Sequence, residues 1–213
     1  MRWPFAREGN THIAVTAGLT LALFALDVAV LPWLALAATL FTLNFFRDPE
    51  RVPPADPSLL VAPADGRVIK VTEIHDDRFL HGPAKVVCIF MSPLDVHVNR
   101  VPADSRVVDV IYREGSFLRA WADEASVDNE QSAVIAERPD GTRFCFVQIS
   151  GFVARRIVSY LKPGMEIRRG ERYGMIKFGS RADIYLPPSA EVLVAVGDRT
   201  TAGVTAIARW PWP

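Results

Sequence analysis

The longest apolar stretch of the chain, residues 11–46, constrains the fold more than any other feature. It contains one formally charged side chain, Asp27, and Pro32 follows a few residues later. A straight membrane crossing needs about 20 apolar residues, so the stretch is too long for one crossing and just long enough for two short ones. We therefore expect residues 1–46 to form a hydrophobic helical hairpin that anchors the chain in a membrane, either spanning it or re-entering on one side.

Basic residues flank this stretch at both ends, with Arg2 and Arg7 before it and Arg47 and Arg51 after it. The positive-inside tendency places both flanks on the cytoplasmic side of the membrane. This predicts a protein of the cell membrane whose following domain lies on the cytoplasmic face. The alternative is a secretory signal peptide cleaved at the A-x-A pattern of residues 35–37, but the apolar run continues past that site and exceeds a signal core.

The rest of the chain, residues 47–213, is predicted to form a β-rich domain. Prolines are frequent between residues 47 and 66, which predicts an extended connector. Short runs rich in Val and Ile then alternate with turn signals, a pattern typical of antiparallel strands. The best helix candidates are residues 115–128 and 151–161. A chain of 213 residues, 50% hydrophobic and with zero formal charge, can bury one sizeable core. The predicted class is α+β, mainly antiparallel β.

Two cysteines, Cys88 and Cys145, lie inside apolar strand-like runs, where a thiol usually behaves as a small buried hydrophobe. The sequence contains no C-x-x-C pair and no metal-ligand spacing, so it predicts neither a disulfide framework nor a metal site. This mildly favours the cytosol over an exported location. Nothing in the sequence indicates a nucleic-acid partner.

Six motifs follow one another between the connector and the C-terminus: "APADGRV", "SPLDVHVNRVP", "YREGSFLRA", "DNEQ", "QISGFVARRIV" and "GMIKFGSRADIYLP". In this order they resemble the phosphatidylserine decarboxylase family, over roughly residues 47–209. The compact length and the form "DVHVNR" are similar to the short branch of that family. The first and last motifs also resemble the paired turns of lipoyl-like domains, so we expect a barrel-sandwich or lipoyl-like β core.

The resemblance implies that the chain cuts itself between Gly179 and Ser180, giving a large chain 1–179 and a small chain 180–213. Gly179 has no side chain to shield its carbonyl, so the Ser180 hydroxyl can approach it for an N-to-O acyl shift. Elimination and hydrolysis would then turn residue 180 into a pyruvoyl group, a covalent cofactor that needs no metal. Its ketone would form a Schiff base with phosphatidylserine and take up the electrons left by carbon dioxide, yielding phosphatidylethanolamine.

His97 is the expected proton-handling residue, because an unperturbed imidazole titrates close to neutral pH. Asp95 would lie on the same face if the segment is a strand. The resemblance also gives Asp65 a part in self-cleavage, as an orienter or acid/base partner of the histidine. Without the resemblance, a lone histidine in a strand is more often structural, and Asp65-Gly66 is a common hairpin turn.

Two positions depart from longer members of the family. Arg100 stands where they carry a second histidine, and Arg181 follows the reactive serine where threonine is common. Either His97 serves both cleavage and decarboxylation, or Arg100 stabilises an anion while another group takes the Ser180 proton. Arg181 is a candidate for attracting the phosphate or carboxylate of the substrate. Both arginines are therefore predicted substrate-binding residues.

Basic side chains outnumber acidic ones by eight to two between residues 151 and 181. Such an excess favours an anionic membrane surface and headgroup, although an ordinary solvated face would have the same composition. The predicted partners are phosphatidylserine, the membrane surface, and the two chains of the same precursor. These chains should stay together because residues 180–213 contain core-like strands. The sequence leaves a homo-oligomer open.

Two other functions fit parts of the pattern. A membrane-tethered lipoyl-like binding or carrier module would remain one chain and present a modifiable Lys or His at a hairpin tip, whereas Lys177 lies just before the Gly-Ser pair. A hydrolase using Asp65, His97 and Ser180 would also remain uncut, and the sequence has no G-x-S-x-G elbow to support it.

Overall fold

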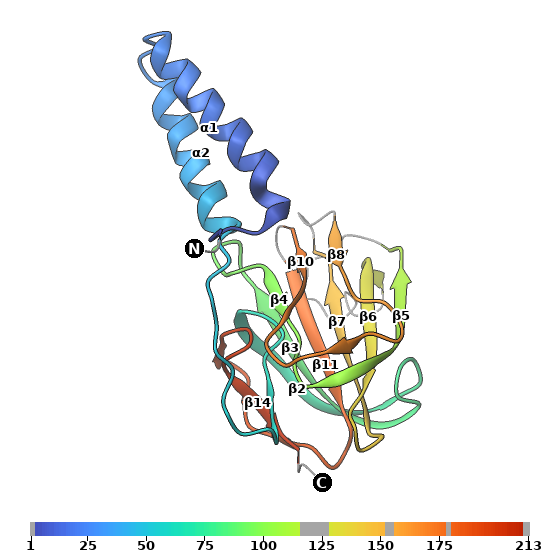
Figure 1. Ribbon diagram of the computed structural model, residues 1–213. Helices are drawn as coiled ribbons and strands as arrows, with labels where there is room; N and C mark the ends of the chain where they lie inside the picture. Colours follow the sequence, from blue (N-terminus) through green and yellow to red (C-terminus); the bar gives the residue numbers. More distant parts are fainter. Residues whose placement is uncertain (1–2, 116–127, 152–155, 178–179, 211–213) are drawn as a thin grey trace. The chain divides into compact units, whose positions relative to one another are not determined.

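The computed structural model describes residues 3–115, 128–151, 156–177 and 180–210 of the chain. The chain separates into two compact units, Met1–Glu50 and Arg51–Pro213. The first is helical and the second is built almost entirely of antiparallel strands (Figure 1). This confirms the predicted α+β class with a helical hairpin at the N-terminus.

The first unit consists of a short 3₁₀ helix, Arg7–Gly9, followed by α1 (Asn10–Ala25) and α2 (Leu31–Phe45). Pro32 lies in the first turn of α2, where its missing N–H is tolerated. The Thr20 and Thr39 hydroxyls share a buried hydrogen bond of 2.9 Å between the two helices. No helix in the described parts of the chain is long and apolar enough to cross a membrane; α1 has 16 residues and α2 has 15.

The described residues of the second unit form one sheet of eight strands and two sheets of three. The strand order is β13-β2-β3-β11-β7-β6-β5-β9 in the large sheet, and β1-β14-β12 and β4-β10-β8 in the small ones. The strands are β1 (Leu59–Val61), β2 (Gly66–Asp76), β3 (Gly82–Met91), β4 (Val98–Arg100), β5 (Ser105–Arg113), β6 (Gln131–Glu137), β7 (Arg143–Ile149), β8 (Ile157–Ser159), β9 (Glu166–Ile167), β10 (Arg172–Ile176), β11 (Ser180–Leu186), β12 (Glu191–Val192), β13 (Arg199–Thr200) and β14 (Ala206–Arg209).

The helix predicted for residues 151–161 is wrong where the structure describes it. Ile157–Ser159 is the strand β8, and it pairs antiparallel with β10. Its Ile and Val have branched side chains that suit a pleated surface, and the available partner strand outweighs the helical spacing of the apolar residues. Most of the other predicted helix, residues 115–128, lies outside the described residues.

Strand β11 occupies the middle of the large sheet, between β3 and β7 (Figure 1). All seven of its residues are buried. Ala182, Ile184 and Leu186 pack into the main core, while Tyr185 packs into a second core on the other face of the sheet. The main core also receives Ile207 and Trp210 from the C-terminal segment. Residues after 179 therefore contribute to the interior of the domain rather than to its surface.

Cys88 and Cys145 are both buried in the second core, as predicted. Burial is the main cause that raises the pKa of each thiol, because the thiolate would lose its hydration there. Both cysteines are therefore buried in the interior as neutral thiols. Within the described residues, no group of three or more His, Cys, Asp or Glu side chains is arranged to hold a metal ion.

The small sheet β4-β10-β8 contacts the large sheet closely at Gly174 of β10. A Cβ atom at this position would lie 2.1 Å from the Val158 carbonyl oxygen and 3.0 Å from Nε2 of Gln148 on β7. No larger residue fits there without moving the backbone. The absence of a side chain at Gly174 therefore allows β10 to pass directly over the end of β7, close to the start of β11.

Candidate active site

Ser180 is the first residue of β11 and lies directly opposite Met91, the last residue of β3. Its side chain is fully buried, and its hydroxyl has no hydrogen-bond partner among the described residues. Leaving a buried polar group unpaired costs about 1–3 kcal/mol, so such groups are rare without a functional reason. Gly179, the other half of the predicted cleavage site, lies outside the described residues.

His97 is carried by the segment that connects β3 to β4, which starts beside Met91 and therefore near Ser180. A tight turn shapes this segment, because the Ser92 N–H donates to the Asp95 carboxylate at 2.8 Å. His97 is fully buried, and its Nδ1 lies 2.9 Å from the Asp95 carbonyl oxygen. A carbonyl can only accept, so Nδ1 must carry the hydrogen of the neutral imidazole. The other nitrogen, Nε2, is then the basic one.

The side chain of Asp95 does not orient His97 directly. Its Oδ1 accepts a hydrogen bond from Arg199 at 3.3 Å, and its Oδ2 accepts the Ser92 N–H. The sequence predicted Asp95 and His97 on one strand face, whereas the structure connects them through a backbone carbonyl. The side chain of Asp95 therefore stabilises the turn, and the backbone carbonyl of the same residue orients the imidazole.

Two buried amides that the sequence motifs did not indicate also belong to this region. Gln148 donates from Nε2 to Oδ1 of Asn99 at 2.9 Å and to the Val158 carbonyl at 3.3 Å. Asn99 in turn lies with its Nδ2 3.9 Å from the Met91 sulfur. Both amide side chains are fully buried. The available signal was Gln148 itself, a long polar residue within the apolar run "FCFVQI", and the spacing of Asn99 two residues after His97.

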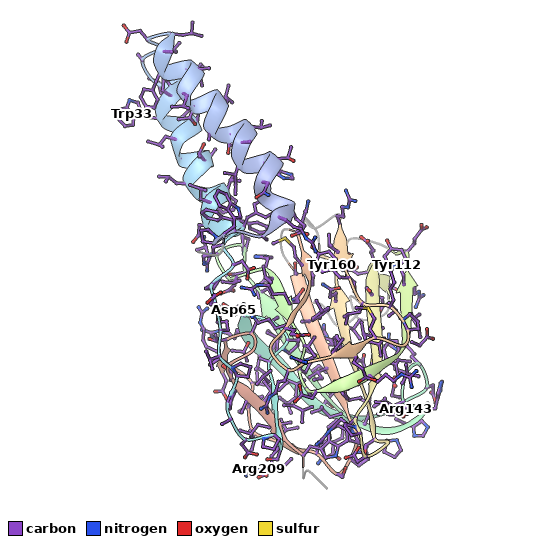
Figure 2. All side chains as sticks on the ribbon, viewed as in Figure 1. Trp33, Asp65, Tyr112, Arg143, Tyr160 and Arg209 are labelled. Carbon is purple, nitrogen blue, oxygen red and sulfur yellow. The ribbon has the colours of Figure 1, made fainter. Side chains whose placement is uncertain are left out.

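Asp65 lies in the loop between β1 and β2 (Figure 2). Its two carboxylate oxygens pair with both terminal nitrogens of Arg51, at 3.2 and 3.0 Å. The carboxylate also accepts the Ala202 N–H at 2.8 Å. Its hydrogen bonds therefore go to Arg51 and Ala202 and not to His97. The part in self-cleavage expected for Asp65 stays a prediction, and in this state of the chain Asp65 ties the connector to the C-terminal segment.

Replacing Asp65 by asparagine is expected to lower the free energy of unfolding by about 2 kcal/mol. The side chains of Arg51 and Asp65 are only 12% and 15% exposed, so the guanidinium would lose its carboxylate in a poorly hydrated place. Urea unfolding of precursors that also carry Ser180→Ala would measure this on a single chain. Glu137→Gln is the control, because its pair with Arg143 is largely exposed and should contribute at most about 0.5 kcal/mol. Equal losses in the two variants would contradict the prediction.

Arg100 is buried, and its Nη1 donates to the Gly170 carbonyl at 2.8 Å. A Cβ atom on Gly203 would lie 2.7 Å from its Cδ, so the side chain runs closely against the C-terminal segment. Arg100 therefore helps to hold separate loops together. Its predicted role in binding an anion is not tested by these contacts and stays a prediction.

Arg181 is also buried, on the sheet face opposite to Ser180. Its Nε and Nη2 contact the two carboxylate oxygens of Asp183 at 2.6 and 3.0 Å, and Nη2 lies 2.9 Å from the Cys88 sulfur. Burial opposes the charged form of Arg181, but the Asp183 carboxylate outweighs it and raises the pKa of the guanidinium. Its predicted role in substrate binding stays a prediction, and the structure shows it as part of an interior ion pair.

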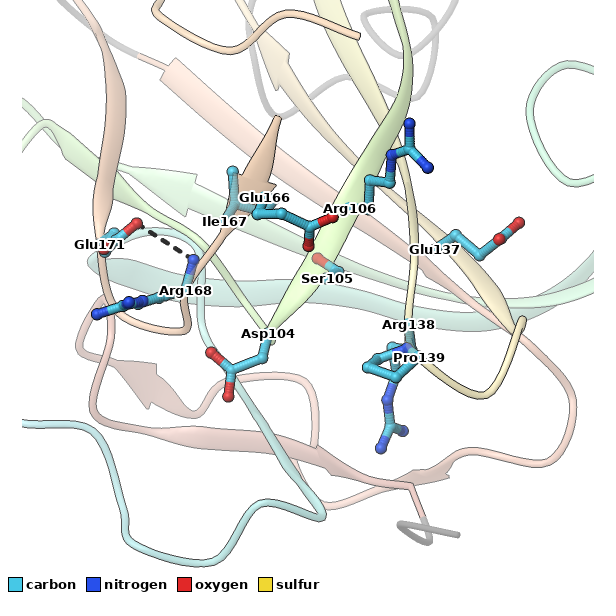
Figure 3. Close-up of a pocket in the computed structure, with 10 residues that line it drawn as sticks. All are labelled: Asp104, Ser105, Arg106, Glu137, Arg138, Pro139, Glu166, Ile167, Arg168 and Glu171. Carbon is cyan, nitrogen blue, oxygen red and sulfur yellow. Dashed lines mark hydrogen bonds between the residues drawn. The ribbon is translucent and has the colours of Figure 1, made fainter. Parts of the chain in front are cut away.

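A large charged cavity of about 790 Å³ lies elsewhere on the domain (Figure 3). It is lined by the start of β5, the turn after β6 and the segment around β9, and neither Ser180, His97 nor Asp65 lines it. Figure 3 shows acidic and basic side chains interspersed around it, with the Arg168 N–H donating to Glu171 at 3.2 Å. The candidate active site is therefore the buried polar cluster at the start of β11 rather than this cavity.

Comparison with known proteins assigns this arrangement to a family. Residues 38–208 match the phosphatidylserine decarboxylase family. A protein from Trichlorobacter lovleyi named "Phosphatidylserine decarboxylase proenzyme" is 46% identical over 209 residues, which cover 95% of this chain and 94% of that protein. Proteins of the same name from Solidesulfovibrio magneticus and Salinibacter ruber are 46% and 48% identical, over 96% and 84% of this chain and 95% and 80% of their own lengths.

Proposed function

The chain belongs to the phosphatidylserine decarboxylase family, and from this we propose that it is a precursor that cuts itself between Gly179 and Ser180. We further propose that a pyruvoyl group made from Ser180 then decarboxylates phosphatidylserine to phosphatidylethanolamine. Membership makes the protein a decarboxylase, as its relatives are named. The word proenzyme in those names denotes a precursor that is processed, which supports the first step.

The observation that carries the proposal is the hydroxyl of Ser180. It is fully buried, has no partner among the described residues, and starts the central strand of the sheet. A hydroxyl not tied up in a hydrogen bond is available to attack a neighbouring carbonyl. The residues present therefore fit a group formed from Ser180 itself, because its hydroxyl does not first have to leave a partner among the described residues.

The proposed cleavage requires neither an oxidant nor a metal. Nε2 of His97 takes the proton from Oγ of Ser180, Oγ bonds to the Gly179 carbonyl carbon, and the peptide C–N bond breaks as its nitrogen gains a proton. Loss of the Cα proton of residue 180 then expels the Gly179 carboxylate from Cβ. The resulting enamine tautomerises to an imine, and water displaces its nitrogen as ammonia.

In the finished enzyme the pyruvoyl ketone supplies an electrophilic carbonyl that binds the substrate amine and takes up the electron pair left by carbon dioxide. The protein holds this group in place through β3 and β7, which flank residue 180 and the rest of β11. His97, on the segment next to Met91, would return a proton to the substrate carbon that has lost its carboxylate. Because the site is buried, water has little access to it and does not compete with the substrate carbon for this proton.

The proposal places the enzyme at a membrane, because its substrate is a lipid. Several large apolar side chains of the helical hairpin are exposed, which fits contact with a lipid surface. They include Val15, Leu19, Leu21, Trp33, Leu34 and Leu40. Together with the basic flanks of the hairpin, they support attachment to the cytoplasmic face of the cell membrane.

Intact mass spectrometry of the purified full-length protein, kept in detergent or lipid, tests the proposal. We expect two chains, the smaller starting at residue 180 and lighter by one ammonia than the same peptide starting with serine. The same preparation should convert phosphatidylserine in vesicles to phosphatidylethanolamine and carbon dioxide. A single unmodified chain in a folded preparation would rule out self-cleavage as its normal state and would favour a tethered carrier module.

A further inference from the structure

Gln148 lies beside Ser180 on the same face of the large sheet. Its backbone pairs with Ala182, two residues after Ser180 on β11. Side chains directly opposite each other in antiparallel strands share a face, and so do residues two apart along one strand. Gln148 and Ser180 are therefore diagonal neighbours, a separation of about 7–8 Å that long side chains can bridge.

The hydrogen bonds of Gln148 fix the orientation of its amide. One of its partners is the Val158 backbone carbonyl, which can only accept, so the atom facing it must be the Nε2 donor. The second bond, to Oδ1 of Asn99, fits the same orientation. The opposite atom, Oε1, is buried and has no hydrogen-bond partner among the described residues. The side chain is thus held by its nitrogen and presents a free acceptor.

Asn99 connects this amide to the other neighbour of Ser180. It accepts from Gln148 on the β7 side and contacts the sulfur of Met91 on the β3 side, and Met91 is directly opposite Ser180. Gln148 therefore lies on the sheet face to which the Ser180 side chain belongs, and Asn99 connects it to Met91. The Ser180 hydroxyl and the Gln148 Oε1 are both buried and have no hydrogen-bond partner among the described residues.

We propose that Gln148 is a positioning residue for self-cleavage, whose Oε1 accepts the hydrogen of the Ser180 hydroxyl and directs an oxygen lone pair towards the Gly179 carbonyl carbon. An amide oxygen is too weakly basic to remove the proton, so the O–H bond must turn from Oε1 to Nε2 of His97 as Oγ attacks, and the proton then passes to His97. Asn99 and the Val158 carbonyl serve to hold the amide in this orientation. The inference rests on the proposed function and adds to it a residue that controls the rate of the first step.

The test follows cleavage of newly made full-length protein in a cell-free translation supplied with phospholipid vesicles. Gln148→Met preserves the length of the side chain and removes the acceptor, so it should slow cleavage roughly 10- to 100-fold, as expected for a misdirected nucleophile. Ser105→Ala is the comparison, because Ser105 is also buried but lies at the start of β5, where its hydroxyl donates to the Ala103 carbonyl at 3.0 Å. We expect it to cleave at the parent rate.

Stability must be separated from positioning. The melting temperatures of Ser180→Ala and Ser180→Ala/Gln148→Met precursors, neither of which can cut itself, show whether the methionine disturbs the fold. Slow cleavage with similar melting temperatures supports the proposal. Cleavage of Gln148→Met at the parent rate, or equal slowing by Gln148→Met and Ser105→Ala, overturns it. If the parent itself stays uncut, the proposed function fails instead, so the two failures are distinguishable.

A second variant, Gln148→Glu, keeps the proposal testable if the methionine variant does not fold. When neutral, the introduced carboxyl can both donate to Asn99 and accept from Ser180, so cleavage should approach the parent rate at low pH. Once ionised, it has no hydrogen left to donate to the Asn99 and Val158 oxygens, so its orientation is lost and the cleavage rate should fall at high pH, a limb that the parent lacks. Arg181 and Asp183 lie on the other face of the sheet. A profile of the same shape as that of the parent overturns the proposal.

Discussion

Replacing Ser180 by alanine is expected to leave the whole chain uncut and without decarboxylase activity. The serine oxygen is the proposed nucleophile, and it is also the leaving atom whose elimination creates the ketone, so a methyl group can replace neither function. The loss should be complete rather than partial. Intact mass would show one chain of 213 residues, and phosphatidylserine in vesicles would remain unchanged.

Ser105→Ala provides the control for this loss. Ser105 is a buried serine at the start of β5, and its hydroxyl donates to the Ala103 carbonyl at 3.0 Å. Its removal should cost about 1 kcal/mol of stability and leave cleavage intact. If Ser180→Ala still yielded two chains with a break before residue 180, another nucleophile would be responsible and the proposal would be wrong.

Replacing His97 by glutamine is expected to slow self-cleavage by roughly 10²- to 10⁴-fold, the usual effect of losing a general base. The structure gives the reason, because the Asp95 carbonyl holds the hydrogen on Nδ1 and leaves Nε2 as the basic nitrogen. Glutamine keeps a polar group of similar length but no basic nitrogen. The rate can be followed by pulse-chase translation with vesicles, and decarboxylation should be measured per cut molecule so that the two steps are separated.

His75→Gln is the matched control for this variant. His75 lies near the end of β2, and its exposed imidazole is 3.4 Å from the equally exposed Asp77 carboxylate. Its replacement should change neither cleavage nor activity. Cleavage of His97→Gln at the parent rate would assign the base to another residue. In that case decarboxylation per cut molecule would still show whether His97 returns the proton to the substrate.

Local sequence patterns predicted those features of the fold that are determined by residues close together in the chain. The hairpin followed from an apolar run interrupted near Asp27 and Pro32, and the strands followed from short Val- and Ile-rich segments between turns. The burial of both cysteines followed from the apolar runs around them. The helix expected at 151–161 failed because a partner strand, β10, was available to Ile157–Ser159, and local spacing does not reveal such a partner.

The environment of the candidate site could not be predicted in this way, because its contacts join residues far apart in the chain. Asn99 and Gln148 meet across 49 positions, and Arg181 meets the Cys88 sulfur across 93. The contacts of Asp65 with Arg51 and of His97 with the Asp95 carbonyl were likewise not indicated by the sequence. Such pairings depend on the order of strands in the sheet, which no single segment encodes.

The central place of β11 has a consequence for the timing of the proposed reaction. Ser180 reaches its buried position only when β11 has inserted between β3 and β7, strands made much earlier in the chain. In a molecule that has not completed this insertion, Ser180 is neither opposite Met91 nor on the sheet face of Gln148, so it would stay uncut. Self-cleavage would then occur only in molecules whose β11 strand has been inserted. Every cut chain would therefore have folded correctly before it was cut.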